Sequence, residues 1–163
     1  MTTRITRILV PTDFSETSDR ALDYAHLLAR HFGASVHLLH VLPDVAGPEA
    51  SVQAFLADGA AERAEALADA RASLRHRSVG IASQEALFGV ADATIVAYAS
   101  QARMDLIVMG THGRTGVAHL LMGSVAERVV RTATCPVLTV RGVPAEGRIP
   151  VLAAETAATL PAC

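Results

Sequence analysis

The sequence contains no lysine and no tryptophan, and it has only two cysteines among its 163 residues. All 14 basic residues are therefore arginines, which excludes chemistry that needs an amine, such as a Schiff base or a phosphate-binding Walker lysine. The two cysteines, Cys135 and Cys163, have neither the spacing of a metal site nor that of a disulfide framework. If this chain binds phosphates, then backbone amides, hydroxyls and arginine must bind them.

Long hydrophobic runs and a strong net charge are also missing. Although 51% of the residues are apolar, no stretch approaches the uncharged run of about twenty residues that a membrane span needs. The formal net charge of −2 gives no indication of a surface for nucleic acid. The first residues lack the layout of a signal peptide. We therefore expect a cytoplasmic protein without membrane or nucleic-acid partners, and its length predicts one domain.

Short apolar runs alternate with helical patterns along the chain. Strands are predicted over residues 4–11, 35–42, 79–87, 105–109 and 137–140. Helices are predicted to run from a Ser15 cap to Gly33, to span residues 50–75, to follow Gly89, and to follow Ser124. This alternation predicts the α/β class, with a single open five-stranded parallel sheet and helices on both faces.

The segment from Gly110 to Ser124, GTHGRTGVAHLLMGS, interrupts this pattern with glycine and small polar residues. It follows an apolar strand and leads into an amphipathic helix, which is how α/β proteins build a phosphate cradle. We predict close approach of ligand and backbone at Gly110, Gly113 and Gly123. Two competing roles stay open: Gly110 and Gly113 provide positive backbone angles, and Ser124 forms a capping box with Glu127, a role that is compatible with phosphate binding at the same helix start.

The spacing Gly110-x2-Gly113-x9-Gly123-Ser124 resembles the ATP-binding signature of the universal stress protein family. Three more segments resemble that family in the same order along the chain: ILVPTDFSETSDRALDYA, HVLPD and CPVLTV. The resemblance implies a nucleotide-binding domain over residues 1–141 and leaves an Ala/Pro-rich tail at 142–163 outside it. It also implies a Rossmann-like sheet, as in adenine nucleotide alpha hydrolases, with strand order 3-2-1-4-5.

That strand order implies a ligand crevice between the carboxyl ends of the first and fourth strands. The resemblance and the loop chemistry together predict fourteen nucleotide-binding residues. They are Pro11, Thr12, Asp13, Val41, Met109, Gly110, Thr111, His112, Gly113, Arg114, Gly116, Gly123, Ser124 and Val125.

Several of these residues have more than one interpretation. Asp13 is predicted to bind a ribose hydroxyl, the adenine amino group or a magnesium ion bridging phosphates; alternatively its carboxylate stabilises the turn before Ser15. By analogy with the family, Val41 offers backbone groups to adenine. Arg114 either pairs with the β- or γ-phosphate or is exposed. His112 has no carboxylate or cysteine nearby to complete a set of metal ligands.

The predicted function is that of a dimeric regulatory module that binds ATP, with or without magnesium, and signals its occupancy to a protein partner. Family members commonly dimerise through their last strands, here Val137 to Arg141. The alternatives are a slow magnesium-dependent ATPase and a nucleotide-free interaction protein, and AMP or a cyclic nucleotide are alternatives to ATP. No catalytic residue is assigned, because the chain lacks a nucleophile elbow, a Walker motif and a set of metal-holding carboxylates.

Overall fold

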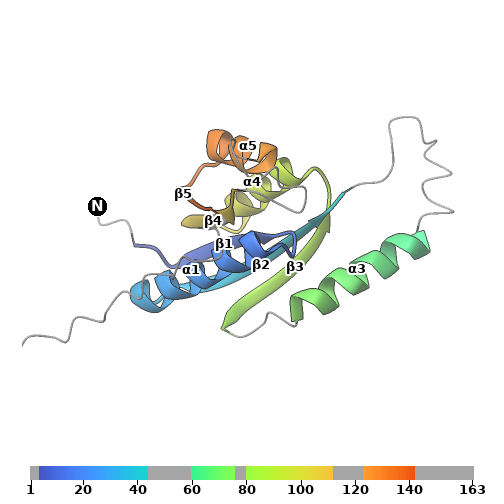
Figure 1. Ribbon diagram of the computed structural model, residues 1–163, viewed down its shortest axis with the longest axis horizontal. Coiled ribbons are helices and arrows are strands. Elements are labelled where there is room, and N and C mark those ends of the chain that lie inside the picture. The colour runs from blue at the N-terminus through green and yellow to red at the C-terminus, as the bar shows by residue number, and fades with distance from the viewer. Residues whose placement is uncertain (1–3, 44–59, 76–79, 112–122, 142–163) are drawn as a thin grey trace, which may run out of the picture.

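Five parallel strands form the centre of the computed structural model, which describes residues 4–43, 60–75, 80–111 and 123–141 (Figure 1). The strands are β1 (Arg7–Thr12), β2 (Ser35–Leu42), β3 (Ile81–Phe88), β4 (Leu106–Gly110) and β5 (Val137–Val140). They lie in the order β3-β2-β1-β4-β5, and all the neighbouring pairs are parallel. The predicted α/β class and the strand order implied by the resemblance are both confirmed.

Helices cover both faces of this sheet. On one face, α1 (Glu16–Phe32) and α3 (Ala60–Arg75) share a core cluster with Ile8 and Val10 of β1. On the other face, α4 (Ala91–Gln101) and α5 (Ser124–Thr132) share a second cluster with Leu9. Successive strand residues point to opposite faces, so a strand covered on both sides is apolar at every position. This is why β1 appears in the sequence as an unbroken apolar run.

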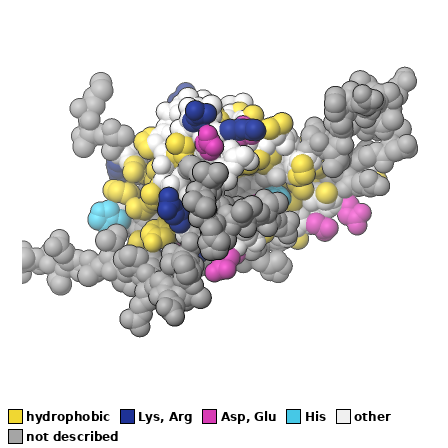
Figure 2. Space-filling view, turned by 45° about the horizontal axis from the view of Figure 1, so that its top comes forward, with side chains coloured by type: hydrophobic (Ala, Val, Ile, Leu, Met, Phe, Trp, Pro, Cys, Tyr) yellow, Lys and Arg dark blue, Asp and Glu magenta, His cyan; other side chains and the backbone are white. Residues whose placement is uncertain are grey.

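The predicted ends of α1 are confirmed. The Ser15 hydroxyl accepts a hydrogen bond from the Ser18 amide at 3.2 Å, and Gly33 ends the helix with a φ of +66°, in the left-handed region that glycine adopts without strain. Of α3, the described part begins at Ala60, so the predicted helical residues 50–59 lie outside the described residues, as does the tail at 142–163. None of the described helices is long and apolar enough to cross a membrane. On the face shown in Figure 2, arginine and acidic side chains lie interspersed with hydrophobic ones.

Asp105 joins the start of β4 to the start of β1. Its Oδ2 accepts hydrogen bonds from the Thr6 amide (2.8 Å), the Thr6 hydroxyl (2.7 Å) and the Arg7 amide (2.9 Å). Partial burial by itself raises the pKa of Asp105, but the hydrogen bonds from Thr6 and Arg7 and the charge of Arg7 outweigh it, so the pKa lies below its ordinary value.

Replacing Asp105 is expected to destabilise the fold in a pH-dependent way. Because the folded-state pKa is depressed, the carboxylate adds stability above its unfolded pKa, and this stability is lost as the pH falls through the folded pKa. Asp105→Asn should therefore lower the free energy of unfolding by about 1 kcal/mol at neutral pH, a value discounted for solvent screening. In urea titrations the difference from the wild type should shrink in acid, and a difference that is equal at both pH values would contradict this explanation.

Candidate functional site

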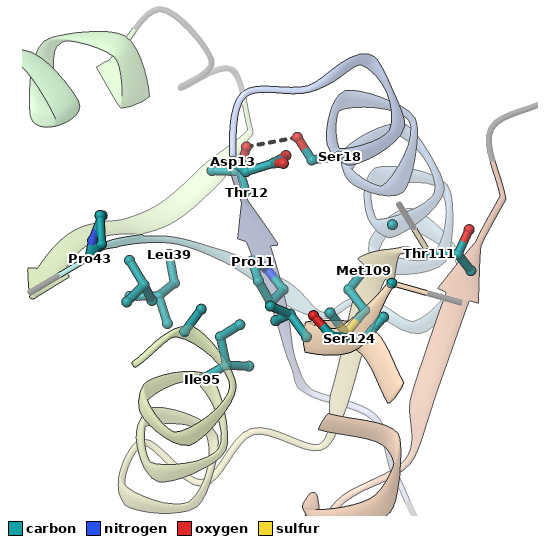
Figure 3. A pocket seen from close by; sticks show the side chains of 16 residues that line it. Pro11, Thr12, Asp13, Ser18, Leu39, Pro43, Ile95, Met109, Thr111 and Ser124 are labelled. Carbon is teal, nitrogen blue, oxygen red and sulfur yellow. Dashed lines mark hydrogen bonds between the residues drawn. The ribbon is translucent and has the colours of Figure 1, made fainter. Parts of the chain in front are cut away.

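A cavity of about 520 Å³ opens at the carboxyl ends of the central strands (Figure 3). It lies where the strand order reverses between β1 and β4, the place where ligands bind in open parallel sheets. It is lined by sixteen residues, which come from the ends of β1 and β4 and from β2, α1, α4 and α5. They are Pro11, Thr12, Asp13, Ser18, Leu39, Val41, Pro43, Ala91, Ile95, Met109, Gly110, Thr111, Gly123, Ser124, Val125 and Ala126.

Ten of the fourteen residues predicted to bind a nucleotide line this cavity. They are Pro11, Thr12, Asp13, Val41, Met109, Gly110, Thr111, Gly123, Ser124 and Val125. The remaining four, His112, Gly113, Arg114 and Gly116, lie outside the described residues. The structure therefore brings four separate stretches of sequence to the same cavity: the ends of β1 and β4, the start of α5, and Val41 of β2.

The apolar end of the cavity was missed by sequence reasoning. Leu39 and Pro43 come from β2 and its end, and Ala91 and Ile95 come from α4; Figure 3 shows Leu39, Pro43 and Ile95 together on one side. Leu39 and Ile95 are buried members of the second core cluster. In the sequence, Leu39 and Ile95 have the pattern of ordinary core residues. Ala91 and Ile95 both belong to the predicted inward-facing stripe of α4, and such a stripe also indicates core packing. These apolar side chains are suited to contact a planar, weakly polar group of a ligand.

Hydroxyls and one carboxylate make up the side formed by β1 and α1. Thr12 and Ser18 lie 3.0 Å apart through their hydroxyl oxygens. Because Ser18 donates its proton to the Ser15 carbonyl at 2.8 Å, Thr12 is the donor of this pair. The described residues bury three polar side chains, Thr12 (6% exposed), Ser18 (4%) and Thr111 (4%), and all three line the cavity. The buried polar residues of the described part of the chain therefore all lie at the cavity.

Asp13 fulfils the turn interpretation and also lines the cavity. Its Oδ1 accepts hydrogen bonds from the Ser15 amide (3.1 Å) and the Ser15 hydroxyl (2.6 Å). The two interpretations of Asp13 are thus compatible, since the turn orients the carboxylate at the edge of the cavity. Within the described ranges, no three His, Cys, Asp or Glu side chains form a metal site. A cation here would rely on Asp13 and on oxygens of the ligand itself.

The start of α5 differs from the predicted capping box. The helix begins at Ser124, and Gly123 is the N-cap without a side-chain cap bond. The capping-box prediction is wrong because Ser124 is already the first helical residue, one position too late to cap. The first amides of a helix have no partner within it, and they carry its positive dipole end. Gly123 donates its own amide to the Thr111 carbonyl at 2.6 Å, and Glu127 donates the first intrahelical bond to the Gly123 carbonyl at 2.9 Å. The residues between them, Ser124, Val125 and Ala126, all line the cavity.

Positive backbone angles do not explain Gly110 or Gly123. Gly123 has a φ of −58°, and Gly110 is absent from the described glycines with positive φ, which are Gly33, Gly80 and Gly89. Instead, Gly110 is closely covered by α1. A Cβ at Gly110 would lie 2.8 Å from Thr17 Cγ2 and 3.2 Å from the Thr17 carbonyl carbon and oxygen. Close helix–strand packing therefore requires this glycine, in addition to any approach of a ligand.

Comparison with known proteins agrees with the fold. The sequence profile of the universal stress protein family matches residues 4–141. Universal stress protein MJ0531 of Methanocaldococcus jannaschii is 38% identical over 139 residues, covering 83% of this chain and 81% of its own length. Among solved structures, MJ0577 has a TM-score of 0.74 at 28% identity and UspA of Lactobacillus plantarum 0.71 at 30%. They cover 86% and 85% of this chain and 99% of each of those chains.

Proposed function

This chain belongs to the universal stress protein family, and from that premise we propose that it is a regulatory module that binds ATP without turning it over efficiently. One observation carries the proposal. A single cavity at the reversal of strand order combines an apolar end with the uncapped start of a helix. A nucleotide has the same two parts, a flat base and an anionic phosphate chain.

The proposed orientation of ATP follows from the lining chemistry. The base lies at the apolar end against Leu39 and Ile95, with the backbone of Val41 beside it. The phosphates lie at the amides of Ser124 and Val125, because the positive end of the α5 dipole attracts anions. Asp13 lies on another wall, where a carboxylate accepts hydrogen bonds from ribose hydroxyls or an amino group and repels phosphate. When magnesium is bound to the phosphates, Asp13 would help to hold it, because the cation would offset that repulsion.

Efficient turnover is not part of the proposal. Phosphoryl transfer generally needs carboxylates that hold metal, cationic clamps and a positioned nucleophile. Asp13 is the single charged side chain among the described lining residues, and the chain has no lysine. Occupancy of the site is proposed to be read by a protein partner. The alternative of a slow magnesium-dependent ATPase requires phosphate release that is lost in Asp13→Ala while the fold persists.

The test is mass spectrometry of small molecules released from freshly purified protein, paired with calorimetric titration. ATP, AMP and cAMP are titrated with and without magnesium. We expect ATP to bind one per chain, with or without the metal. Absence of both co-purified nucleotide and binding heat would reject ATP binding and leave the nucleotide-free interaction protein as the function.

A homodimer through β5 is part of the proposal. β5 is an edge strand. The carbonyls of Pro136 and Val140 accept hydrogen bonds from Ile107 and Thr111, at 3.0 and 2.8 Å, so these two residues face β4. Because successive residues of a strand alternate, Val137 and Thr139 direct their backbone groups away from β4. An edge of this kind is a template for pairing with another strand.

Thr139→Pro is expected to convert the dimer to a monomer. Proline removes an outward N–H from the edge while leaving the ladder to β4 intact, since the alternation along β5 directs the Thr139 N–H away from β4. The matched control is Thr139→Val, which keeps the N–H and should remain dimeric. Sedimentation of the three proteins measures the mass. A wild-type monomer, or an unchanged dimer of Thr139→Pro, would exclude pairing through this edge.

A further inference from the structure

Phe14 lies next to the cavity in a backbone conformation that bulky residues rarely adopt. Its φ is +63°, in the left-handed region, although it has a full aromatic side chain. Such a conformation persists only when the surrounding contacts hold it, and it is often found at functional sites. Phe14 lies between Asp13 and Ser15, so its conformation brings the Ser15 donors to the Asp13 carboxylate.

His40 makes two contacts with this turn. It is the register partner of Thr12 on the neighbouring strand, and its Nδ1 lies 2.7 Å from the Thr12 carbonyl oxygen. A carbonyl accepts hydrogen bonds only, so Nδ1 carries the proton and donates it. The His40 ring also lies against the ring of Phe14, with centroids 4.3 Å apart and planes inclined by 32°. One side chain therefore holds both the residue before Asp13 and the residue after it.

The other side of the turn is held by hydroxyls. The Thr12 Oγ1 accepts from the Phe14 amide at 3.0 Å while it donates to Ser18. Ser15 donates to Asp13 from both its amide and its hydroxyl. His40 approaches from the neighbouring strand, whereas these groups belong to the turn and the first turn of α1. Removing His40 therefore leaves the local bonds in place but takes one donor from the Thr12 carbonyl and one aromatic neighbour from the Phe14 ring.

We infer that His40 is a positioning residue of the nucleotide site: its Nδ1–H holds the Thr12 carbonyl, which keeps Phe14 left-handed and presents Asp13 to the ligand. His40 itself is not among the residues that line the cavity. It acts through Asp13, and only the binding part of this inference rests on the proposed function.

Two substitutions separate the hydrogen bond from the ring. His40→Phe keeps an aromatic ring against Phe14 but removes the donor, and it should weaken ATP binding about tenfold, the effect of losing one well-made hydrogen bond. His40→Asn keeps an N–H donor at a similar reach and loses the ring. It should retain affinity to within about threefold of the wild type if the hydrogen bond is the main contribution. Thermal unfolding of each variant checks that the fold is intact.

Phe14→Gly tests whether His40 acts through the strained residue. Glycine adopts a φ of +63° without cost, so the turn no longer needs His40 to hold it. In that background His40→Phe should change ATP affinity by less than about threefold, a non-additivity typical of residues that act on one element. Equal losses in both backgrounds would show that His40 does not act through Phe14.

A ligand-free measurement separates this inference from the proposed function. The Phe14 amide is protected by its bond to Thr12 Oγ1, so its hydrogen exchange should accelerate about tenfold in His40→Phe, with the exchange of core amides such as Ile107 unchanged. If exchange at Phe14 accelerates but titration shows no ATP binding in the wild type, the positioning role is supported and ATP binding is rejected. Unchanged exchange, or faster exchange with unchanged ATP affinity, would overturn the inference.

Discussion

Ala91→Phe is expected to weaken ATP binding at least about 100-fold while leaving the fold intact. Ala91 lies in the first turn of α4 and lines the apolar end of the cavity together with Leu39 and Ile95. A phenyl ring at this position would occupy the space proposed for the base, and a ligand cannot share a filled pocket. The ring would be covered by apolar neighbours, so the free energy of unfolding should not fall.

Ala93→Phe is the matched control for this prediction. Ala93 is two residues away on the same helix, is exposed, and does not line the cavity. Calorimetric titration with ATP should show nearly unchanged affinity for Ala93→Phe and none within range for Ala91→Phe. Full affinity in Ala91→Phe would mean that the base does not use the apolar end, and the orientation proposed for ATP would be wrong.

The sheet was predictable from the sequence because its central strands are buried on both faces. Ile8 and Val10 pack toward α1 and α3 while Leu9 packs toward α4 and α5, and that double burial requires the apolar run that marks β1. The order of the strands, in contrast, could not be predicted from the residues alone. Nothing in the residues of β4 specifies that it pairs with β1 rather than β2, so the order came from the family resemblance.

The site was predictable where it consists of loop ends and not where it consists of packed elements. Asp13 and Gly123 interrupt apolar patterns, and that signal is visible in the sequence. Leu39 and Ile95 meet only because α4 packs across β2, and a helical or strand period assigns such residues to the core. Ser18 looks like an ordinary polar residue of a first helical turn. It becomes 4% exposed only when α1 closes on the end of β1.

Gly110 was predicted as a site residue, and the structure shows a second reason why this position is glycine. Its place in the glycine pattern predicted proximity to a ligand, and it does line the cavity. The requirement for glycine, however, arises from Thr17 on α1, which is 93 positions earlier in the chain. No local pattern reports a contact between elements so distant in sequence, which is why sequence reasoning offered only ligand approach or a positive φ.

Gly110→Val is expected to destabilise the fold strongly. Even a methyl group would lie 2.8 Å from Thr17 Cγ2 and 3.2 Å from two backbone atoms of Thr17, closer than ordinary contact allows. Overpacking of this kind costs about 1–3 kcal/mol for a small addition, so we expect a loss in that range for Gly110→Ala and a larger one for Gly110→Val. Denaturant titration of the two variants and the wild type measures the losses.

Two further variants identify steric crowding as the cause. Thr17→Ala removes the Cγ2 atom but leaves the backbone, so it should rescue Gly110→Ala only in part. Gly33 provides the opposite case, because an added Cβ there meets nothing within 4 Å while the φ of +66° demands a left-handed residue. Asparagine tolerates that conformation, so Gly33→Asn should be mild and Gly110→Asn severe. If the two asparagine variants lost equal stability, the approach of α1 would not be the reason that position 110 requires glycine.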